Sequence, residues 1–126
     1  MNNGETKKNP IQEKSYAFAL RVVKICHNLT ISKKEYVLSR QFLRSGTSVG
    51  ANIEEALGAQ SKKEFAAKMS IAHKEARETH YWLRLLMDSN TLDGAEAKSL
   101  IVDCKEVLRI VGAIQRTVRA NLIEQH

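Results

Sequence analysis

The stretch "RQFLRSGTSVGANIEEA", residues 40–56, decides the fold, because its periodicity indicates a helix whereas its letters are those of a loop. Gly46 and Gly50 would each cost a helix about 1 kcal/mol relative to alanine. Apolar and small residues nevertheless keep the helical spacing of four and three through the whole segment: Leu38, Phe42, Ser45, Val49, Asn52 and Ala56. We therefore expect one continuous helix near 33–58, with packing that compensates for the glycines.

Capping signals predict where the helices begin. Ser32 followed by Glu35 indicates the start of the helix that carries the quoted segment, and Gly58 would follow its end. The other starts are marked by Asn9-Pro10 before a helix near 10–30, by Ser61 with Glu64 before 62–89, and by Asp93 before 94–123. Four amphipathic helices with short links predict an all-α, antiparallel up-down-up-down four-helix bundle, formed by residues 9–126 as a single domain behind a flexible basic tail, residues 1–8.

Composition points to a soluble domain with a basic bias. The chain has 126 residues and a net charge of +6, and the surplus of lysine and arginine is greatest in residues 1–30. Such a bias is compatible with nucleic-acid binding, although each single lysine can equally be part of a solvated surface. The candidate nucleic-acid contacts, which lie near the chain start and the expected helix ends, are Lys7, Lys8, Lys14, Lys33, Lys34, Lys62 and Lys63.

Neither a membrane segment nor a secretory signal is expected. The first ten residues are polar, and no apolar run is long enough to span a bilayer. These features predict a cytoplasmic protein that does not bind to membranes.

The small polar residues of the quoted segment are expected to face carboxylates of the third helix. Folding the second helix against the third places Glu75 and Glu78 opposite it, and carboxylates cannot be buried without partners. We refer to the predicted contact as the polar seam, with the members Gln41, Arg44, Ser45, Ser48, Asn52, Glu75 and Glu78. A ligand pocket at the same place is the competing interpretation.

The third helix carries a second stripe beside its core stripe, and this stripe includes a tryptophan. Ile71, Trp82 and Leu85 are the candidate subunit interface, because a lone bundle needs one apolar stripe per helix. The alternative is that Trp82 only widens the edge of the core.

Enzyme chemistry and cofactors are not expected. Cys26 and Cys104 lie within apolar stripes, where free cysteines behave as small core residues. A di-iron site in a bundle needs Glu-x-x-His pairs, but none occurs, and His73 and His80 are seven residues apart. The glycines of the quoted segment do not follow a strand, so they do not form a phosphate-binding loop. The chain is therefore predicted to be non-enzymatic and to hold no metal or cofactor.

The segment "LSRQFLRSGTSVGANIEEALGAQSKKEFAAKMSIAHKEARETHYWLRLL" resembles the four-helix-bundle proteins named after the intervening sequences of 23S rRNA genes, often labelled S23 ribosomal proteins. The pattern of that family maps onto Gln41 to Val49, Asn52 to Glu55, Ser61 to Phe65 and Lys74 to Leu83, with Phe42 where leucine is usual. The resemblance implies a small cytoplasmic bacterial bundle that assembles into a ring, typically a homopentamer, without enzymatic activity.

Two functional classes follow from the charge and the resemblance. The first is an oligomer that binds RNA or DNA through basic surface patches. A similar bundle serves as the basic accessory subunit of diversity-generating retroelements, but this chain shares only its fold and charge. The second class is a protein-interaction scaffold without affinity for nucleic acid. Only the first class should show binding that weakens steeply as salt rises.

Overall fold

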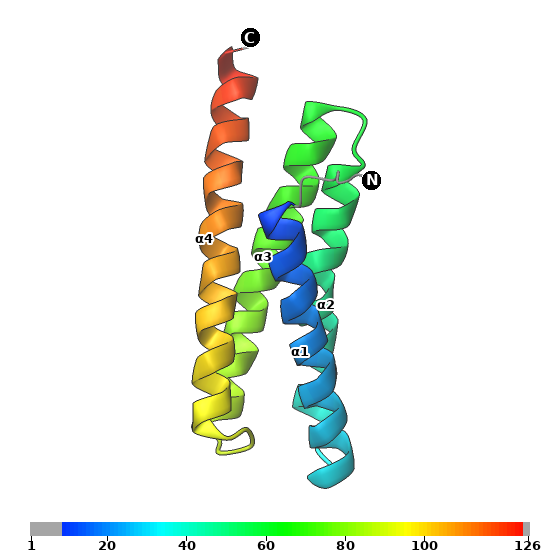
Figure 1. Cartoon of the computed structure of the whole chain (residues 1–126), viewed down its shortest axis with the longest axis vertical. Coiled ribbons are helices and arrows are strands. Elements are labelled where there is room, and N and C mark those ends of the chain that lie inside the picture. The colour runs from blue at the N-terminus through cyan, green and yellow to red at the C-terminus, as the bar shows by residue number, and fades with distance from the viewer. Residues whose placement is uncertain (1–8, 125–126) are drawn as a thin grey trace, which may run out of the picture.

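The structure, a computed structural model, describes residues 9–124, with side chains up to residue 122, and consists of four helices joined by short links. The chain runs down α1, up α2, down α3 and up α4, so neighbouring helices are antiparallel (Figure 1). The bounds are Pro10–Ser32 for α1, Val37–Leu57 for α2, Lys62–Asp88 for α3 and Gly94–Glu124 for α4. No strand occurs among the described residues, so the predicted four-helix bundle is confirmed. The predicted tail, residues 1–8, lies outside the described part of the chain.

Three of the predicted helix caps are present. The Asn9 side chain accepts hydrogen bonds from the backbone N–H groups of Ile11 and Gln12 at 3.1 and 3.2 Å. Ser61 accepts from the N–H of Glu64 at 3.0 Å, and the Glu64 carboxylate in return accepts from the N–H of Gln60. Asp93 accepts from the N–H of Glu96 at 3.2 Å. Each cap satisfies backbone donors that the first helical turn leaves unpaired.

The predicted start of the second helix is wrong. Ser32 is the last residue of α1, and its hydroxyl donates to the Asn28 side chain. The backbone N–H groups that open α2 instead point at the Glu35 carboxylate, over distances of 2.7 to 3.1 Å. One carboxylate thus satisfies several unpaired donors where a serine hydroxyl would satisfy one. Lys34, in the left-handed region at φ 54°, separates the two helices.

The helix is continuous through both glycines, as predicted, but the glycines face α1 rather than α3. A Cβ atom on Gly46 would lie 2.9 Å from both methyl carbons of Val22, and one on Gly50 would lie 3.5 Å from the carbonyl oxygen of Ser15. The absence of side chains at these two positions lets α1 and α2 approach closely. This close approach answers the question raised by the loop-like letters.

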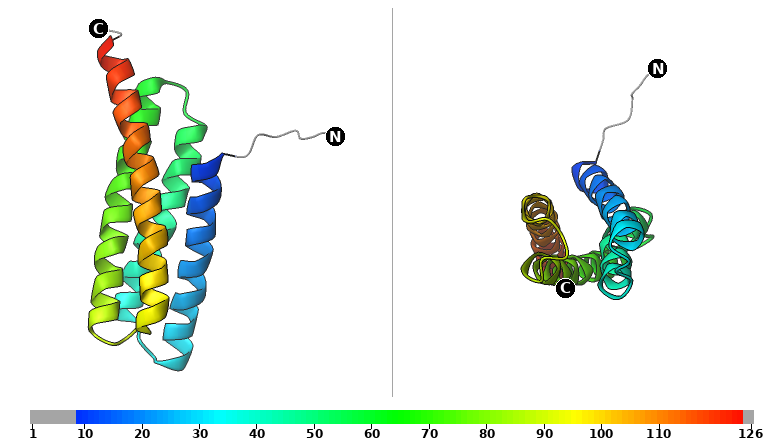
Figure 2. Two further views of the ribbon diagram at one scale, coloured as in Figure 1. Left: turned by 60° about the vertical axis from the view of Figure 1, so that its left-hand side comes forward. Right: turned by 90° about the horizontal axis from the view of Figure 1, so that it is seen from below.

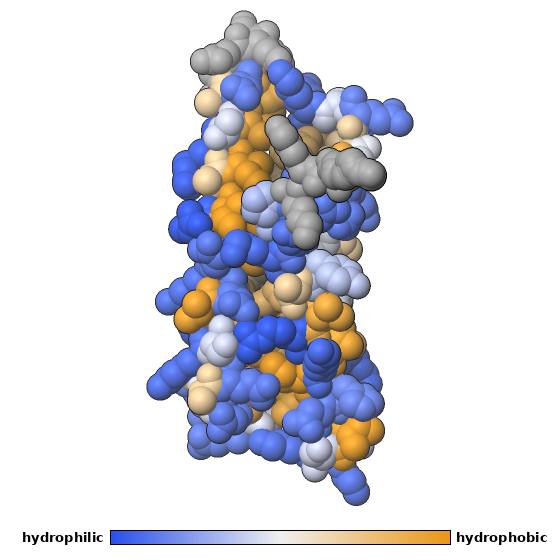
Figure 3. Space-filling model, in the orientation of Figure 1, coloured by the Kyte–Doolittle hydropathy of each residue, from blue (hydrophilic) through white to orange (hydrophobic). Residues whose placement is uncertain are grey.

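Neighbouring helices pack in the order α1, α2, α3, α4. Seen along the bundle, α1 and α2 form one side and α3 and α4 the other, and α1 contacts α4 less extensively than helices that follow one another in the chain (Figure 2). Buried residues form two apolar clusters, one including Phe18, Phe42 and Leu83, the other including Val49 and Met69. The face of the molecule shown in Figure 3 is mostly polar, with a column of hydrophobic residues along the upper part of α4.

Candidate functional site

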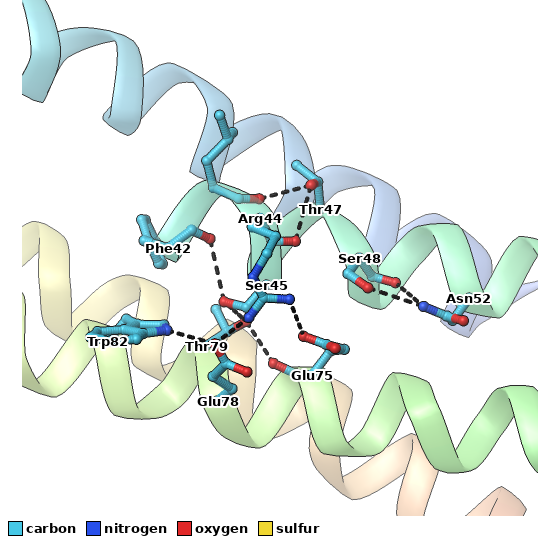
Figure 4. Close-up of polar contacts among 11 residues, drawn as sticks. Phe42, Arg44, Ser45, Thr47, Ser48, Asn52, Glu75, Glu78, Thr79 and Trp82 are labelled. Carbon is cyan, nitrogen blue, oxygen red and sulfur yellow. Dashed lines mark hydrogen bonds and ion pairs between the residues drawn. The ribbon is translucent and has the colours of Figure 1, made fainter. Parts of the chain in front are cut away.

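A charged network joins α2 to α3 at the polar seam (Figure 4). Nη1 of Arg44 donates to Oε1 of Glu75 at 3.1 Å, and Nη2 of the same guanidinium donates to Oε2 of Glu78. The indole N–H of Trp82 donates to the same Glu78 oxygen at 3.0 Å. The hydrogen bond from Trp82, together with that from Arg44, lowers the pKa of the Glu78 carboxyl. The exposed fractions of the Glu75 and Arg44 side chains are 13% and 50%, so the network lies at the edge of the core.

The other predicted members of the polar seam do not contact the two carboxylates. Ser45 is fully buried and accepts a hydrogen bond from the Thr79 hydroxyl at 2.8 Å. Asn52 donates to the hydroxyl and the carbonyl of Ser48 within α2, while Gln41 is exposed. Thr79 and Trp82 are polar partners that the sequence prediction missed, because the first lies on the core stripe of α3 and the second was assigned to a subunit interface.

The candidate subunit interface is partly exposed. Ile71 is 39% exposed and Leu85 36%, whereas Trp82 is half-buried and packs against the core. A further apolar stripe, which the sequence analysis did not single out, lies on α1, where Tyr16 is 64% and Val23 45% exposed. The bundle therefore offers apolar surface on two sides.

The candidate lysines lie at separate places on the molecule. Lys14 lines a small cleft with Asp103 and Glu106 of α4, so acidic side chains surround it. Lys33, whose Nζ donates to the carbonyl of Thr91, and Lys34 belong to the α1–α2 end of the bundle. The remaining described pair, Lys62 and Lys63, opens α3 at the opposite end, while Lys7 and Lys8 lie outside the described residues.

A different set of basic side chains gathers along the contact between α3 and α4. The Ser70 hydroxyl accepts from the Gln115 side chain at 3.1 Å, which fixes the level of the two helices. A Cβ on Gly112 would lie 3.5 Å from Nη1 of Arg116 and 3.9 Å from Nε2 of His73. We name this set the basic seam, with the members His73, Arg77, His80, Arg84, Lys105, Arg116 and Arg119.

Both histidines of the basic seam have lowered pKa values. Burial and the neighbouring Arg77 lower the pKa of His73. Burial, with Arg84 and Lys105, lowers the pKa of His80. Burial is the largest cause of both shifts, and the neighbouring positive charges act in the same direction.

The acidic residues of the same helix segments point elsewhere. In the middle of α3, Glu75 and Glu78 face α2 and bind Arg44. In the middle of α4, Asp103 binds Arg21 of α1 at 2.6 Å, and Glu106 binds Arg109 at 2.9 Å on its own helix. Within the described residues 70–87 and 97–119 these four are the acidic residues. The fold therefore separates positive from negative charge across α3 and α4.

The cysteines, possible metal ligands and apolar helix stretches of the described residues are further candidates for a site. Burial raises the pKa of both the Cys26 and the Cys104 thiol to about 12, so neither is a thiolate near neutral pH. No three histidine, cysteine, aspartate or glutamate side chains within this part of the chain are placed to hold a metal ion. None of the four helices has a stretch long and apolar enough to cross a membrane.

Comparison with known proteins places the chain in a family. The model of the 23S rRNA-intervening sequence protein family matches residues 7–113. Among solved structures, a protein of unknown function from the S23 ribosomal protein family of Bacteroides thetaiotaomicron VPI-5482 is 43% identical, with a TM-score of 0.82 over 83% of this chain and 97% of that one. None of the curated proteins searched matches it. The chain belongs to the 23S rRNA-intervening sequence protein family.

Proposed function

We propose that this protein binds the phosphate backbone of nucleic acids along the basic seam and carries out no reaction of its own. The observation that supports this proposal is the separation of charge on α3 and α4, which leaves seven basic side chains along one contact with the carboxylates turned away. Arginine and lysine on an exposed face supply most of the affinity of proteins for nucleic acid.

The geometry favours contacts to phosphate over contacts to bases. From Lys105 to Arg119 an α-helix rises about 21 Å, and a duplex carries one negative charge per about 1.7 Å of its axis, so several phosphates face a seam of this length. Contacts of this kind fix position and carry no sequence information. Binding is therefore proposed to be independent of sequence.

Self-assembly is the second part of the proposal. The exposed apolar residues on α3, Ile71 and Leu85, lie on the α2-facing side of that helix, on the opposite flank from the basic seam. A cytoplasmic homopentamer built through Ile71, Trp82 and Leu85 leaves the basic seam of each subunit free. Five linked seams bind one nucleic acid more tightly than one seam, because the later contacts become intramolecular.

Binding of mixed-sequence RNA and duplex DNA, followed by fluorescence anisotropy over a series of salt concentrations, tests the first part. We expect binding to both nucleic acids, with log affinity falling linearly and steeply against log salt. Absence of binding at low salt contradicts the proposal and favours a protein-interaction scaffold instead.

Light scattering at micromolar concentration tests the second part, and the expected mass is that of a pentamer. Trp82→Ala should weaken assembly, since tryptophan is often central to an interface. Leu20→Ala on α1 is the matched control, because that residue is 44% exposed and lies on another side of the bundle. A monomeric parent protein rules out assembly, and an assembly unaffected by Trp82→Ala rules out this interface.

A further inference from the structure

A cleft on the side of the bundle formed by α1 and α2 carries cationic and aromatic side chains that no feature described so far uses. It has a volume of about 410 Å³, near the lower limit for pockets that hold small ligands. Cys26 of α1 bonds to the carbonyl of Ser39 of α2 at 3.3 Å, which sets the level of the two walls. His27 and Arg40 are the next residues along their helices, and both line the cleft, His27 from α1 and Arg40 from α2.

Four polar side chains of this cleft have no partner within the described part of the chain. The side chains of His27 and Arg40, and the hydroxyls of Thr30 and Tyr36 one level further along, form no hydrogen bond or ion pair there. The nearest acidic residue in the sequence, Glu35, is engaged by the first backbone N–H groups of α2. The cleft is therefore lined by hydrogen-bond donors and by a positive charge without a counter-ion.

We propose that this cleft binds a 5′-nucleotide. A guanidinium is suited to bind a phosphate by two parallel hydrogen bonds, and His27 supplies a second donor from the facing wall. Bases stack on tyrosine and histidine rings, and the Tyr36 ring is 50% exposed. Val23 and Leu43 add apolar surface to the lining, and the hydroxyls of Thr30 and Tyr36 can bind the ribose. The nucleotide is either free or an unstacked unit of an RNA strand, which present the same chemistry.

This site is independent of the basic seam, because α1 and α2 form the opposite side of the bundle from α3 and α4 (Figure 2). The experiment is calorimetric titration of the full chain with AMP, adenosine and inorganic phosphate. We expect AMP to bind at least about tenfold more tightly than either fragment, a difference of about 1.4 kcal/mol. Binding of phosphate as tight as that of AMP, or no binding of AMP, overturns the proposal.

Arg40→Gln should lower AMP affinity at least about tenfold, and His27→Gln should lower it severalfold. Arg84→Gln, which removes an equal charge from the basic seam, is the matched control and should leave AMP affinity unchanged. Equal losses in Arg40→Gln and Arg84→Gln would mean that only net charge matters and would overturn the site. If a single-stranded RNA displaces AMP, the natural ligand is a nucleotide of an RNA strand. If it does not, the natural ligand is a free nucleotide. Since Arg40→Gln leaves the basic seam intact, a failure here does not touch the proposed binding of the phosphate backbone.

Discussion

The two flanks of α3 differ in how their charged side chains are arranged. On the flank that faces α2, Glu75 and Glu78 are neutralised by Arg44 at the edge of the core. On the flank that faces α4, His73 and His80 lie among arginines and a lysine without a neighbouring carboxylate. Paired charges at the edge of a core stabilise the fold, whereas accumulated charge of one sign destabilises it unless a partner is bound. This difference is consistent with a structural role for the polar seam, and it motivates the binding role that we propose for the basic seam.

The largest expected loss of stability comes from breaking the polar seam. Arg44→Ala leaves the Glu75 and Glu78 carboxylates without their cation, and Glu75 is only 13% exposed. Because the network is open to solvent on one side, we expect a loss of about 1–3 kcal/mol in the free energy of unfolding. Arg77→Ala, on the other flank, should change it by less than about 0.5 kcal/mol. Urea denaturation measures both, and equal losses in the two variants would remove the distinction.

A pair of glycine substitutions compares the contact of α1 with α2 and the contact of α3 with α4. Gly46→Ala places a methyl group 2.9 Å from two Val22 carbons in the core. We expect overpacking to outweigh the gain in helix propensity, with a net loss of about 1–2 kcal/mol. The methyl group of Gly112→Ala lies 3.5 Å from the end of the Arg116 side chain and 3.9 Å from Nε2 of His73, both ordinary contact distances, so this variant should gain up to about 1 kcal/mol. Thermal melts of both variants test this, and a Gly46→Ala protein that melts above the parent contradicts the described packing.

The smallest expected effect is a pH dependence of nucleic-acid binding. The pKa values of His73 and His80 lie below 6.5 in the free protein, so both rings are largely neutral at pH 7.5. A bound phosphate chain adds negative charge and raises these pKa values, so binding takes up protons. Affinity should rise as pH falls from 7.5 through the pKa values of the complex and level off below those of the free protein. An increase of one pKa unit corresponds to about a tenfold gain.

Protein stability should change in the opposite direction over a similar range. Because the pKa values of both histidines are lower in the folded than in the unfolded chain, stability should fall as pH drops through 6.5 and below. His73→Gln with His80→Gln should flatten the pH dependence of binding, measured by anisotropy. An unchanged pH profile in that double variant would mean that the histidines do not face the bound phosphates.

The sequence predicts the helices well, because caps and periodicity are local signals. Asn9, Ser61 and Asp93 each cap the predicted helix. The start of α2 was predicted too early, because Ser32 followed by Glu35 fits the capping pattern. In the structure the Glu35 carboxylate itself accepts from the first backbone N–H groups of α2. The side-chain contacts between helices were predicted less well, because an offset of one helical turn changes which side chains meet. That offset brings Ser45 to Thr79 instead of to a carboxylate.

The basic seam was not predicted from the sequence, although its members on α3 recur at helical spacings of four and three: His73, Arg77, His80 and Arg84. Counted along the chain, α3 and α4 carry eleven basic and eight acidic residues, so their surplus of positive charge is modest. The acidic and basic residues separate only when each helix presents one set to one neighbour, as Glu75 does toward α2 and Asp103 toward α1. The lysines at the helix ends, which do stand out in the sequence, are instead distributed over both ends of the bundle.

The salt dependence of duplex DNA binding in two matched variants tests the account most directly. Each phosphate contact that is lost lowers the slope of log affinity against log salt by about 0.9. Replacing three members of the basic seam, in Arg77→Gln, Arg116→Gln and Arg119→Gln, should therefore lower the slope by about 2–3. Replacing three helix-end lysines, in Lys34→Gln, Lys62→Gln and Lys63→Gln, removes the same charge and should leave the slope nearly unchanged. A slope that falls only in the lysine variant, or equally in both, would contradict the assignment of nucleic-acid binding to the contact between α3 and α4.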